Sequence, residues 1–244
     1  MRPPGSRLAH IDALRGLAIA QMIAYHFIYD LTYFGWAGFA MWRDQPWVGW
    51  RTAIVTQFLV LVGVGLDLRA AQGSDRHRFR RRWLQIAGAA VLVSVASRAL
   101  FGPRFIWFGV LHFVAVALVL GRPLAALAPR WLWALAALAA AAGLLLHSPR
   151  FDPDTLSWIG FAPRKPATED FVPLLPWLGA VFAGMAVGKL WQRHGFGVVP
   201  ALQGLARKPP APLVLLGRWP LTVYLLHQPL LMGVLWLVQA AGRR

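Results

Sequence analysis

Residues 131–146 read Trp131-Leu-Trp-Ala-Leu-Ala-Ala-Leu-Ala-Ala-Ala-Ala-Gly-Leu-Leu-Leu146, a run without a charged side chain. In lipid, only helices and closed barrels satisfy the hydrogen-bonding groups of the backbone. A barrel strand would alternate polar and apolar residues over about ten positions, whereas this run is continuously apolar and rich in Ala and Leu. It therefore predicts a membrane helix.

Similar apolar runs recur along most of the 244-residue chain, which is 58% hydrophobic and only 14% charged. Soluble domains are about 45–50% apolar and about 25% charged, and a helix that crosses a bilayer needs about 20 apolar residues. The candidate spans are residues 11–31, 50–68, 83–100, 105–121, 130–147, 173–191 and 213–239. We predict an all-α, polytopic membrane helix bundle with about seven transmembrane helices, forming one domain over residues 1–244.

The formal net charge of +16 comes mainly from basic residues that lie between the apolar runs. This is the distribution that the positive-inside rule describes, so we assign the charge to topology and to contacts with membrane lipid, and expect no nucleic acid partner. Residues 69–82 and 189–208 should be cytoplasmic with the N-terminus, and residues 148–171 should lie outside. The chain has no Cys, which excludes disulfides and thiolate nucleophiles.

Four ionisable residues of the first span, Asp12, Arg15, His26 and Asp30, are separated by 3, 11 and 4 positions. At 3.6 residues per turn they form one polar stripe. Ionisable groups in a span are costly and usually mark function. Asp12 and Arg15 could simply pair with each other, but His26 lies about three turns further in. Asp30, one turn beyond, is placed to orient its imidazole as a general base.

Two more histidines, His112 and His227, stand in apolar runs, and either one could be a satisfied core group or part of a site. No ligand spacing supports a metal site, and we expect no metal. Arg218 could contact lipid headgroups or a phosphorylated ligand. It belongs to Gly217-Arg-Trp-Pro220, where Pro220 predicts a break or a re-entrant start within the last apolar run.

Several motifs along the chain resemble the heparan-α-glucosaminide N-acetyltransferase catalytic-domain family, in particular its bacterial members. They are Ile11–Ala20, Met22–Leu31, Phe58–Gly63, Gly109–His112, Phe171–Gly179 and Leu216–Pro229. The first helix is also similar to the wider superfamily of membrane acyltransferases that acetylate surface sugars. Its signature, an Arg and an essential His with ten residues between them, is matched by Arg15 and His26.

The resemblance implies transfer of an acetyl group from cytoplasmic acetyl-CoA to a sugar amine or hydroxyl at or across a bacterial-type inner (plasma) membrane. The heparan enzyme has its essential histidine in the loop after the first helix. Here residues 33–50 contain no histidine, so the assignment of His26 depends on the likeness to the sugar O-acetylases.

On this interpretation the whole chain is one transmembrane acyltransferase-like domain. His26 is the general base, Asp30 orients it, and Arg15 and Arg218, with the basic cytoplasmic loop, contact the coenzyme A phosphates. His112 and His227 line the site in which the acetyl donor binds. The partners would be membrane lipid and a carbohydrate or glycoconjugate acceptor, and self-association as a homo-oligomer stays open.

Two other classes of function compete with the enzyme. A proton-coupled transporter or flippase of a polar or lipid-linked substrate would use the His and Asp residues as a proton relay. A non-catalytic membrane scaffold would need His26 only for stability.

Overall fold

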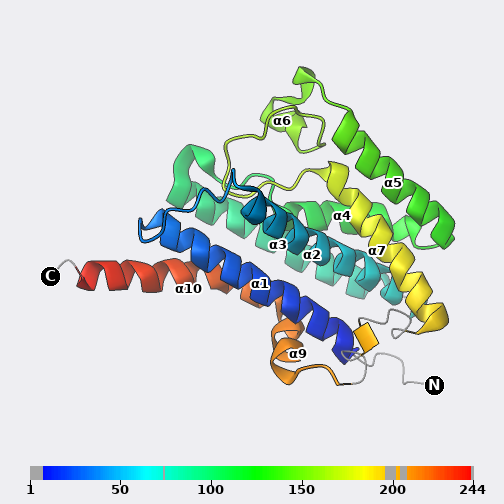
Figure 1. The fold of residues 1–244 in the computed structure, drawn as a ribbon. Coiled ribbons are helices and arrows are strands. Elements are labelled where there is room, and N and C mark those ends of the chain that lie inside the picture. The colour runs from blue at the N-terminus through cyan, green and yellow to red at the C-terminus, as the bar shows by residue number, and fades with distance from the viewer. Residues whose placement is uncertain (1–7, 74, 196–201, 204–207, 243–244) are drawn as a thin grey trace. The chain divides into compact units, whose positions relative to one another are not determined.

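The computed structural model describes residues 8–73, 75–195, 202–203 and 208–242. Within these ranges every regular element is helical, as predicted (Figure 1). The α-helices described are α1 (Ala9–Tyr33), α2 (Gln45–Ala71), α3 (Arg76–Phe101), α4 (Val110–Leu124), α5 (Pro129–Leu145), α6 (Asp154–Ser157), α7 (Leu174–His194), α9 (Ala211–Arg218) and α10 (Pro220–Ala241), with short 3₁₀ helices at Gly102–Arg104 and Pro149–Phe151.

Local sequence explains several helix ends. The Asp75 side chain accepts a hydrogen bond from the backbone N–H of His77 and so caps α3, because the first N–H groups of a helix have no partner inside it. The predicted break before Pro220 is confirmed: Trp219 has φ −121° and ψ 46°, between α9 and α10. A proline disfavours helical geometry in the residue before it, so α9 ends there and α10 begins.

The predicted start of the fourth span at residue 105 is wrong, because α4 begins only at Val110. The preceding segment makes its hydrogen bonds to side chains and to another loop. The Ile106 carbonyl accepts from the Ser94 hydroxyl, the Phe105 carbonyl accepts from Thr168, and the Phe108 carbonyl accepts from the backbone N–H of Val172. These contacts hold 105–109 in an irregular loop although its side chains are apolar.

Among the described residues, four helical segments are long and apolar enough to cross a membrane: Gln45–Ala71, Arg76–Arg104, Leu174–His194 and Pro220–Ala241. Helices α4 and α5 are apolar but shorter, with 15 and 17 residues. Helix α1 has 25 residues, but its ionisable residues reduce its hydropathy. The chain thus has the multiple apolar helices of a multi-pass membrane protein, with seven spans remaining a prediction.

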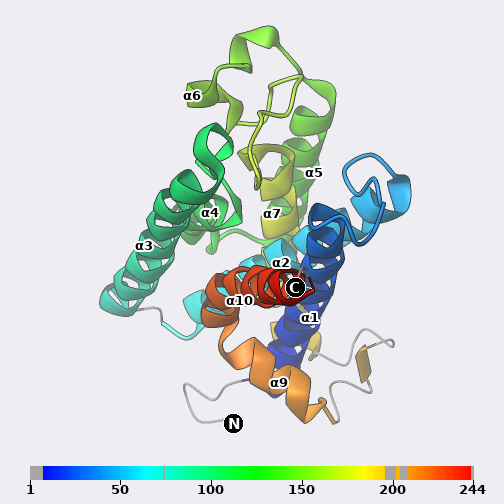
Figure 2. The ribbon, with the colours of Figure 1, turned by 90° about the vertical axis from the view of Figure 1, so that its left-hand side faces the viewer.

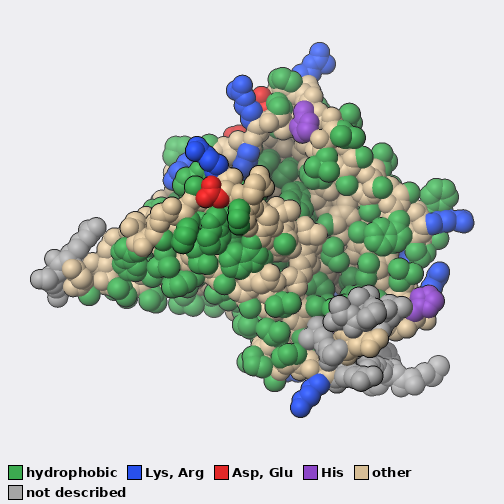
Figure 3. Space-filling view, viewed as in Figure 1, with side chains coloured by type: hydrophobic (Ala, Val, Ile, Leu, Met, Phe, Trp, Pro, Cys, Tyr) green, Lys and Arg blue, Asp and Glu red, His purple; other side chains and the backbone are tan. Residues whose placement is uncertain are grey.

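The surface of these helices is strongly apolar. Helix α3 is typical, because Leu92 is 57% exposed, Val95 65% and Leu100 76%. On α10, Leu230 is 62% exposed and Leu237 61%, and Figure 3 shows hydrophobic side chains gathered over this helix. Large contiguous apolar surface is unfavourable in water, whereas in a bilayer it faces hydrocarbon. The exposed side chains therefore fit lipid contact.

The chain divides into two compact units, the first comprising residues 1–58 and 199–244 and the second 59–198. In the described part of the first unit, α1 lies against α9 and α10 (Figures 1 and 2). A Cβ atom at Gly16 would overlap the Leu213 carbonyl of α9, and one at Gly217 would overlap the Asp12 carbonyl of α1. Reciprocal glycines thus bring the two backbones into contact, as small residues do between membrane helices.

In the second unit, α5 packs along α7, and α3 packs against α4. Glycines again allow backbones to approach: a Cβ atom at Gly63 of α2 would overlap the Val181 carbonyl of α7, and one at Gly184 of α7 would overlap the Val60 carbonyl of α2. This reciprocal contact places the end of α2 beside α7, where the polar residues described below meet. A single domain over the whole chain stays a prediction.

Candidate functional site

The candidate site lies in the first unit, where His26 of α1 meets His227 of α10. Their ring centroids are 4.9 Å apart and the ring planes are inclined by 79°, an edge-to-face contact. His26 is half-buried and His227 is buried. The structure thus brings together two of the three histidines predicted for the site, and these two come from opposite ends of the chain.

Each ring is held by a carbonyl of its own helix. His26 Nδ1 lies 2.9 Å from the Met22 carbonyl oxygen, and His227 Nδ1 lies 2.7 Å from the Tyr224 carbonyl oxygen. A carbonyl can only accept, so Nδ1 carries the proton in both neutral rings and the lone pair is at Nε2. Both imidazoles therefore present a basic Nε2, the form that a general base requires.

Asp30 makes a different contact from the one expected. Its fully buried carboxylate accepts a hydrogen bond at Oδ1 from Gln228 Nε2 of α10, at 2.7 Å, while the position of His26 Nδ1 is fixed by Met22 instead. Asp30 still lies one helical turn from His26, a spacing that brings Cβ atoms to within about 5–6 Å. It therefore remains close enough to stabilise an imidazolium electrostatically.

Gln228 was missed as a site residue, although it follows His227 directly. An amide in an otherwise apolar helix was the available signal. Among the described residues, the buried side-chain atoms without a hydrogen-bond partner are Asp30 Oδ2, Ser157 Oγ, His227 Nε2 and Gln228 Oε1. Three of these four atoms belong to the candidate site. Buried polar groups are normally satisfied, so such a concentration marks the site as unusual.

The two arginines of the predicted site lie at the other end of α1. Arg15 pairs with Asp12 at 2.9 Å, which confirms the pairing that the sequence suggested. At 1.5 Å per residue, Arg15 is about 16 Å from His26 along the helix axis. Arg218 is exposed at the end of α9, and the close approach of Gly217 to the Asp12 carbonyl places it at the same end of α1 as Arg15.

His112 belongs to the second unit and is engaged at both ring nitrogens. Nδ1 accepts from the backbone N–H of Gly109 at 3.2 Å, so Nε2 carries the proton and lies 3.1 Å from the Ser94 hydroxyl oxygen. The neighbouring Val110 N–H donates to Asp170 at 2.9 Å. His112 and Asp170 thus satisfy the start of α4. A place for His112 in a common cavity with the other histidines stays a prediction.

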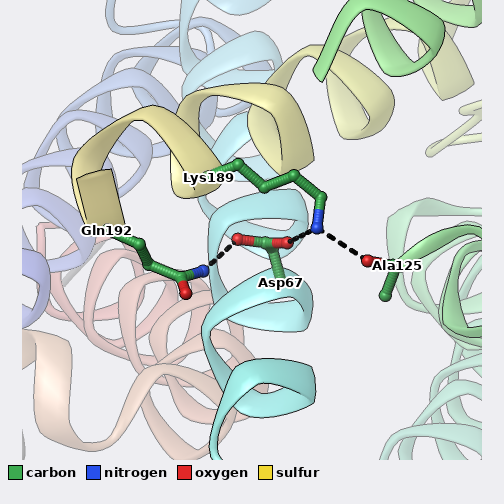
Figure 4. Close-up of polar contacts among 4 residues, drawn as sticks. All are labelled: Asp67, Ala125, Lys189 and Gln192. Atoms are coloured by element: carbon green, nitrogen blue, oxygen red, sulfur yellow. Dashed lines mark hydrogen bonds and ion pairs between the residues drawn. The ribbon is translucent and has the colours of Figure 1, made fainter. Parts of the chain in front are cut away.

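A second buried polar cluster, not noticed in the sequence, is centred on Asp67 of α2 (Figure 4). Asp67 is 1% exposed; its carboxylate lies 3.0 Å from Lys189 Nζ and accepts from Gln192. Lys189 also donates to the Ala125 carbonyl at 2.7 Å. Because the carboxylate oxygens and the ammonium all have partners, this cluster links α2, α7 and the end of α4 rather than offering a reactive group.

Long apolar helices and a cluster of two imidazoles, a buried carboxylate and an amide between α1 and α10 define the class: a multi-pass helical membrane protein with a polar site among its helices. The family model described as heparan-alpha-glucosaminide N-acetyltransferase, catalytic, matches residues 7–229, and the chain belongs to this family. The match includes both histidines of the site. No curated protein and no solved structure gives a significant match to the chain.

Proposed function

We propose that the protein is an integral membrane acetyltransferase that moves an acetyl group from acetyl-CoA to an amine or hydroxyl of a sugar, with His26 as the general base. Membership of an N-acetyltransferase catalytic-domain family supports the reaction class and the acetyl-CoA donor. The spacing of eleven positions from Arg15 supports His26 as the base, and the Met22 carbonyl leaves its lone pair at Nε2. The observation that carries the site is the contact that places the His227 ring against it.

In the proposed reaction, His26 Nε2 removes the proton from the acceptor amine or hydroxyl as its nitrogen or oxygen attacks the acetyl carbonyl. The thioester C–S bond then breaks, the coenzyme A thiolate leaves, and the imidazolium returns the proton to the sulfur. The chain has no Cys to carry the acetyl group as a thioester, so direct transfer with acceptor and acetyl-CoA bound together is the simpler course. Transfer through a transient acetyl-histidine is the alternative. Asp30, one turn away on α1, stabilises the imidazolium.

The separation between His26 and the arginines suits this donor. The pantetheine arm of coenzyme A keeps its thioester distant from its phosphates, so the base and the phosphate-binding groups must lie apart on the protein. Arg15 and Arg218 lie together about three turns from His26, and charge-assisted hydrogen bonds from arginine are effective phosphate contacts. Asp12 already neutralises part of the charge of Arg15, so Arg218 supplies a further cation at this end of α1.

The predicted orientation of the spans agrees with a cytoplasmic acetyl donor. With seven spans the basic segment 69–82 and the N-terminus face the cytoplasm of a bacterial-type inner membrane, where acetyl-CoA is available, and residues 148–171 face outside. Acceptor and lipid are the expected partners. Asp30, near the far end of α1 from Arg15, would then be closer to the outer surface, where a sugar acceptor would enter.

The decisive experiment uses the purified protein in detergent with radiolabelled acetyl-CoA and, as acceptors, membranes or glycans from the expressing cells. Label should move to a carbohydrate with no ion gradient present. A proton-coupled transporter would leave acetyl-CoA unchanged and would move its substrate only in sealed vesicles with a gradient. A scaffold would show neither activity, and replacement of His26 would change only its stability.

A further inference from the structure

The unpartnered atoms of the site are all hydrogen-bond acceptors. Among the described residues these are Asp30 Oδ2, His227 Nε2 and Gln228 Oε1, each buried. Asp30 is 0% exposed and His227 is 8% exposed. A buried acceptor without a donor loses the hydrogen bonds that it made to water in the unfolded chain. Three such atoms on adjoining side chains are a local deficit of donors.

The hydrogen bonds that these side chains already make decide which of their atoms remain without a partner. Gln228 turns its Nε2 toward Asp30 Oδ1, at 2.7 Å, which leaves its carbonyl oxygen as the free end. His227 donates through Nδ1 to the Tyr224 carbonyl, which leaves a lone pair at Nε2. A carboxylate has no proton to give. The contacts that build the cluster therefore leave three acceptors, and no donor, without a hydrogen-bond partner.

We propose that Asp30, Gln228 and His227 form the subsite that binds the hydrogen-bond donors of the carbohydrate acceptor, its hydroxyl groups or an ammonium. This rests on the proposed function. A sugar ring carries O–H donors on neighbouring carbons, and each can serve one of these acceptors. Because the His26 ring lies against His227, a sugar held here lies beside the base. Asp30 and Gln228 are thereby substrate-binding residues in addition to the electrostatic role of Asp30.

A subsite made only of hydrogen-bond acceptors should select sugars with free hydroxyl groups. A sugar whose hydroxyls are blocked as methyl ethers offers only acceptors, which would face the acceptors of the protein. Sites built to hydrogen-bond a hydroxyl reject analogues that lack it by large factors, because the polar groups of the site remain unpaired. Methyl glycosides should therefore bind and their permethylated counterparts should not.

Binding is measured first, without acetyl-CoA, as the rise in Tm of the full-length protein in detergent. The probes are the methyl α-glycosides of glucose, galactose and mannose, their permethylated forms, and glucosamine. At least one free glycoside should stabilise the wild type while its permethylated form does not. If glucosamine raises the Tm more than methyl glucoside does, the Asp30 carboxylate binds the ammonium group of the sugar. If the two raise the Tm equally, the subsite binds hydroxyl groups.

Two variants locate the binding at this subsite. Asp30→Asn keeps the side-chain shape but can place an N–H₂ donor where Oδ2 accepts, and Gln228→Met removes the amide at similar length. Each should weaken the affinity for the glycoside about tenfold, the effect of losing roughly one hydrogen bond. Gln21→Met is the matched control. Gln21 also lies on an apolar helix, but its amide donates to Gln57 at 2.9 Å, so glycoside affinity should not change.

Steady-state kinetics then test whether the subsite binds the acceptor rather than acetyl-CoA. With an acceptor that supports transfer, Asp30→Asn and Gln228→Met should raise the acceptor KM about tenfold, as expected for roughly one lost hydrogen bond, and leave the KM for acetyl-CoA unchanged. The subsite is refuted if no free glycoside stabilises the wild type, or if both folded variants bind glycosides as the wild type does. Glycoside binding without any acetyl transfer would refute the proposed acetyltransferase activity, while the sugar-binding subsite would still be supported.

Discussion

His26 of α1 and His227 of α10 lie edge to face, with ring centroids 4.9 Å apart, although they come from opposite ends of the chain. Each Nδ1 is held by a carbonyl of its own helix, from Met22 and from Tyr224. The two rings thus have the same tautomer for the same local reason. The contact joins α1, which carries the predicted base, to α10, which carries Gln228. The roles of the two histidines can be separated by replacing each in turn.

Replacement of His26 by Ala should abolish acetyl transfer and leave membrane insertion and coenzyme A binding intact. Loss of a general base lowers the rate by about 10²–10⁴-fold, whereas the donor phosphates bind elsewhere. His227→Ala should have a smaller effect on kcat and a larger one on the acceptor KM. Steady-state kinetics and equilibrium binding of coenzyme A measure both. Near-normal turnover by His26→Ala would exclude His26 as the base and assign that role to another group.

The glycine contact between α1 and α9 should be intolerant of any side chain. Gly16→Ala or Gly217→Ala would bring a Cβ atom onto a backbone carbonyl, and such overpacking costs about 1–3 kcal/mol. Unfolding in detergent with increasing SDS measures this loss. Gly233→Ala is the matched control, because no atom lies within 4 Å of its added Cβ. It should be neutral or stabilising by up to about 1 kcal/mol, and equal losses at all three sites would contradict the packing.

The Asp67–Lys189 pair should behave as a buried ion pair. Asp67→Leu or Lys189→Met alone should cost about 3–5 kcal/mol, because the remaining charge stays buried without its partner. The double variant should be much more stable than the sum of the two losses predicts, since it leaves neither charge. SDS unfolding of the four proteins gives the coupling free energy. Strictly additive losses would show that the pair contributes nothing.

His112 should contribute to stability rather than to the chemical step. His112→Ala removes the acceptor for the Gly109 N–H and the partner of Ser94, a loss of about 1–3 kcal/mol for buried polar groups left unsatisfied. The kcat of the correctly folded fraction should remain close to that of the wild type. Thermal unfolding and active-fraction-corrected kinetics test this. A stable but inactive variant would instead support the predicted place of His112 in the site.

The orientation can be tested with single cysteines, since the chain has none. Gln72 and Thr155 are both exposed in the structure. An impermeant maleimide applied to intact cells should label Thr155→Cys, and Gln72→Cys should be labelled only after permeabilisation. Labelling in the opposite pattern would place segment 69–82 outside and would remove the cytoplasmic donor from the proposal.

Much of the fold could be predicted because it depends on properties local to the chain. Continuous apolar runs over the thickness of a bilayer predict helices, and the proline at 220 predicts the break between α9 and α10. Local rules failed at residues 105–109, where apolar side chains occur but the backbone bonds to Ser94, Thr168 and Val172. Those partners are distant in sequence, so hydropathy carried no sign of them.

Some features of the candidate site likewise follow from local sequence, and others depend on tertiary packing. That His26 and Asp30 share a face of α1 follows from helical periodicity, and the Asp12–Arg15 pair follows from a separation of three residues. That Asp30 bonds to Gln228, that His26 meets His227, and that Asp67 is neutralised by Lys189 depend on how helices distant in sequence pack. Glycines allow that packing where the backbones of α1 and α9 touch, and the pattern of a single helix cannot specify which partner it will meet.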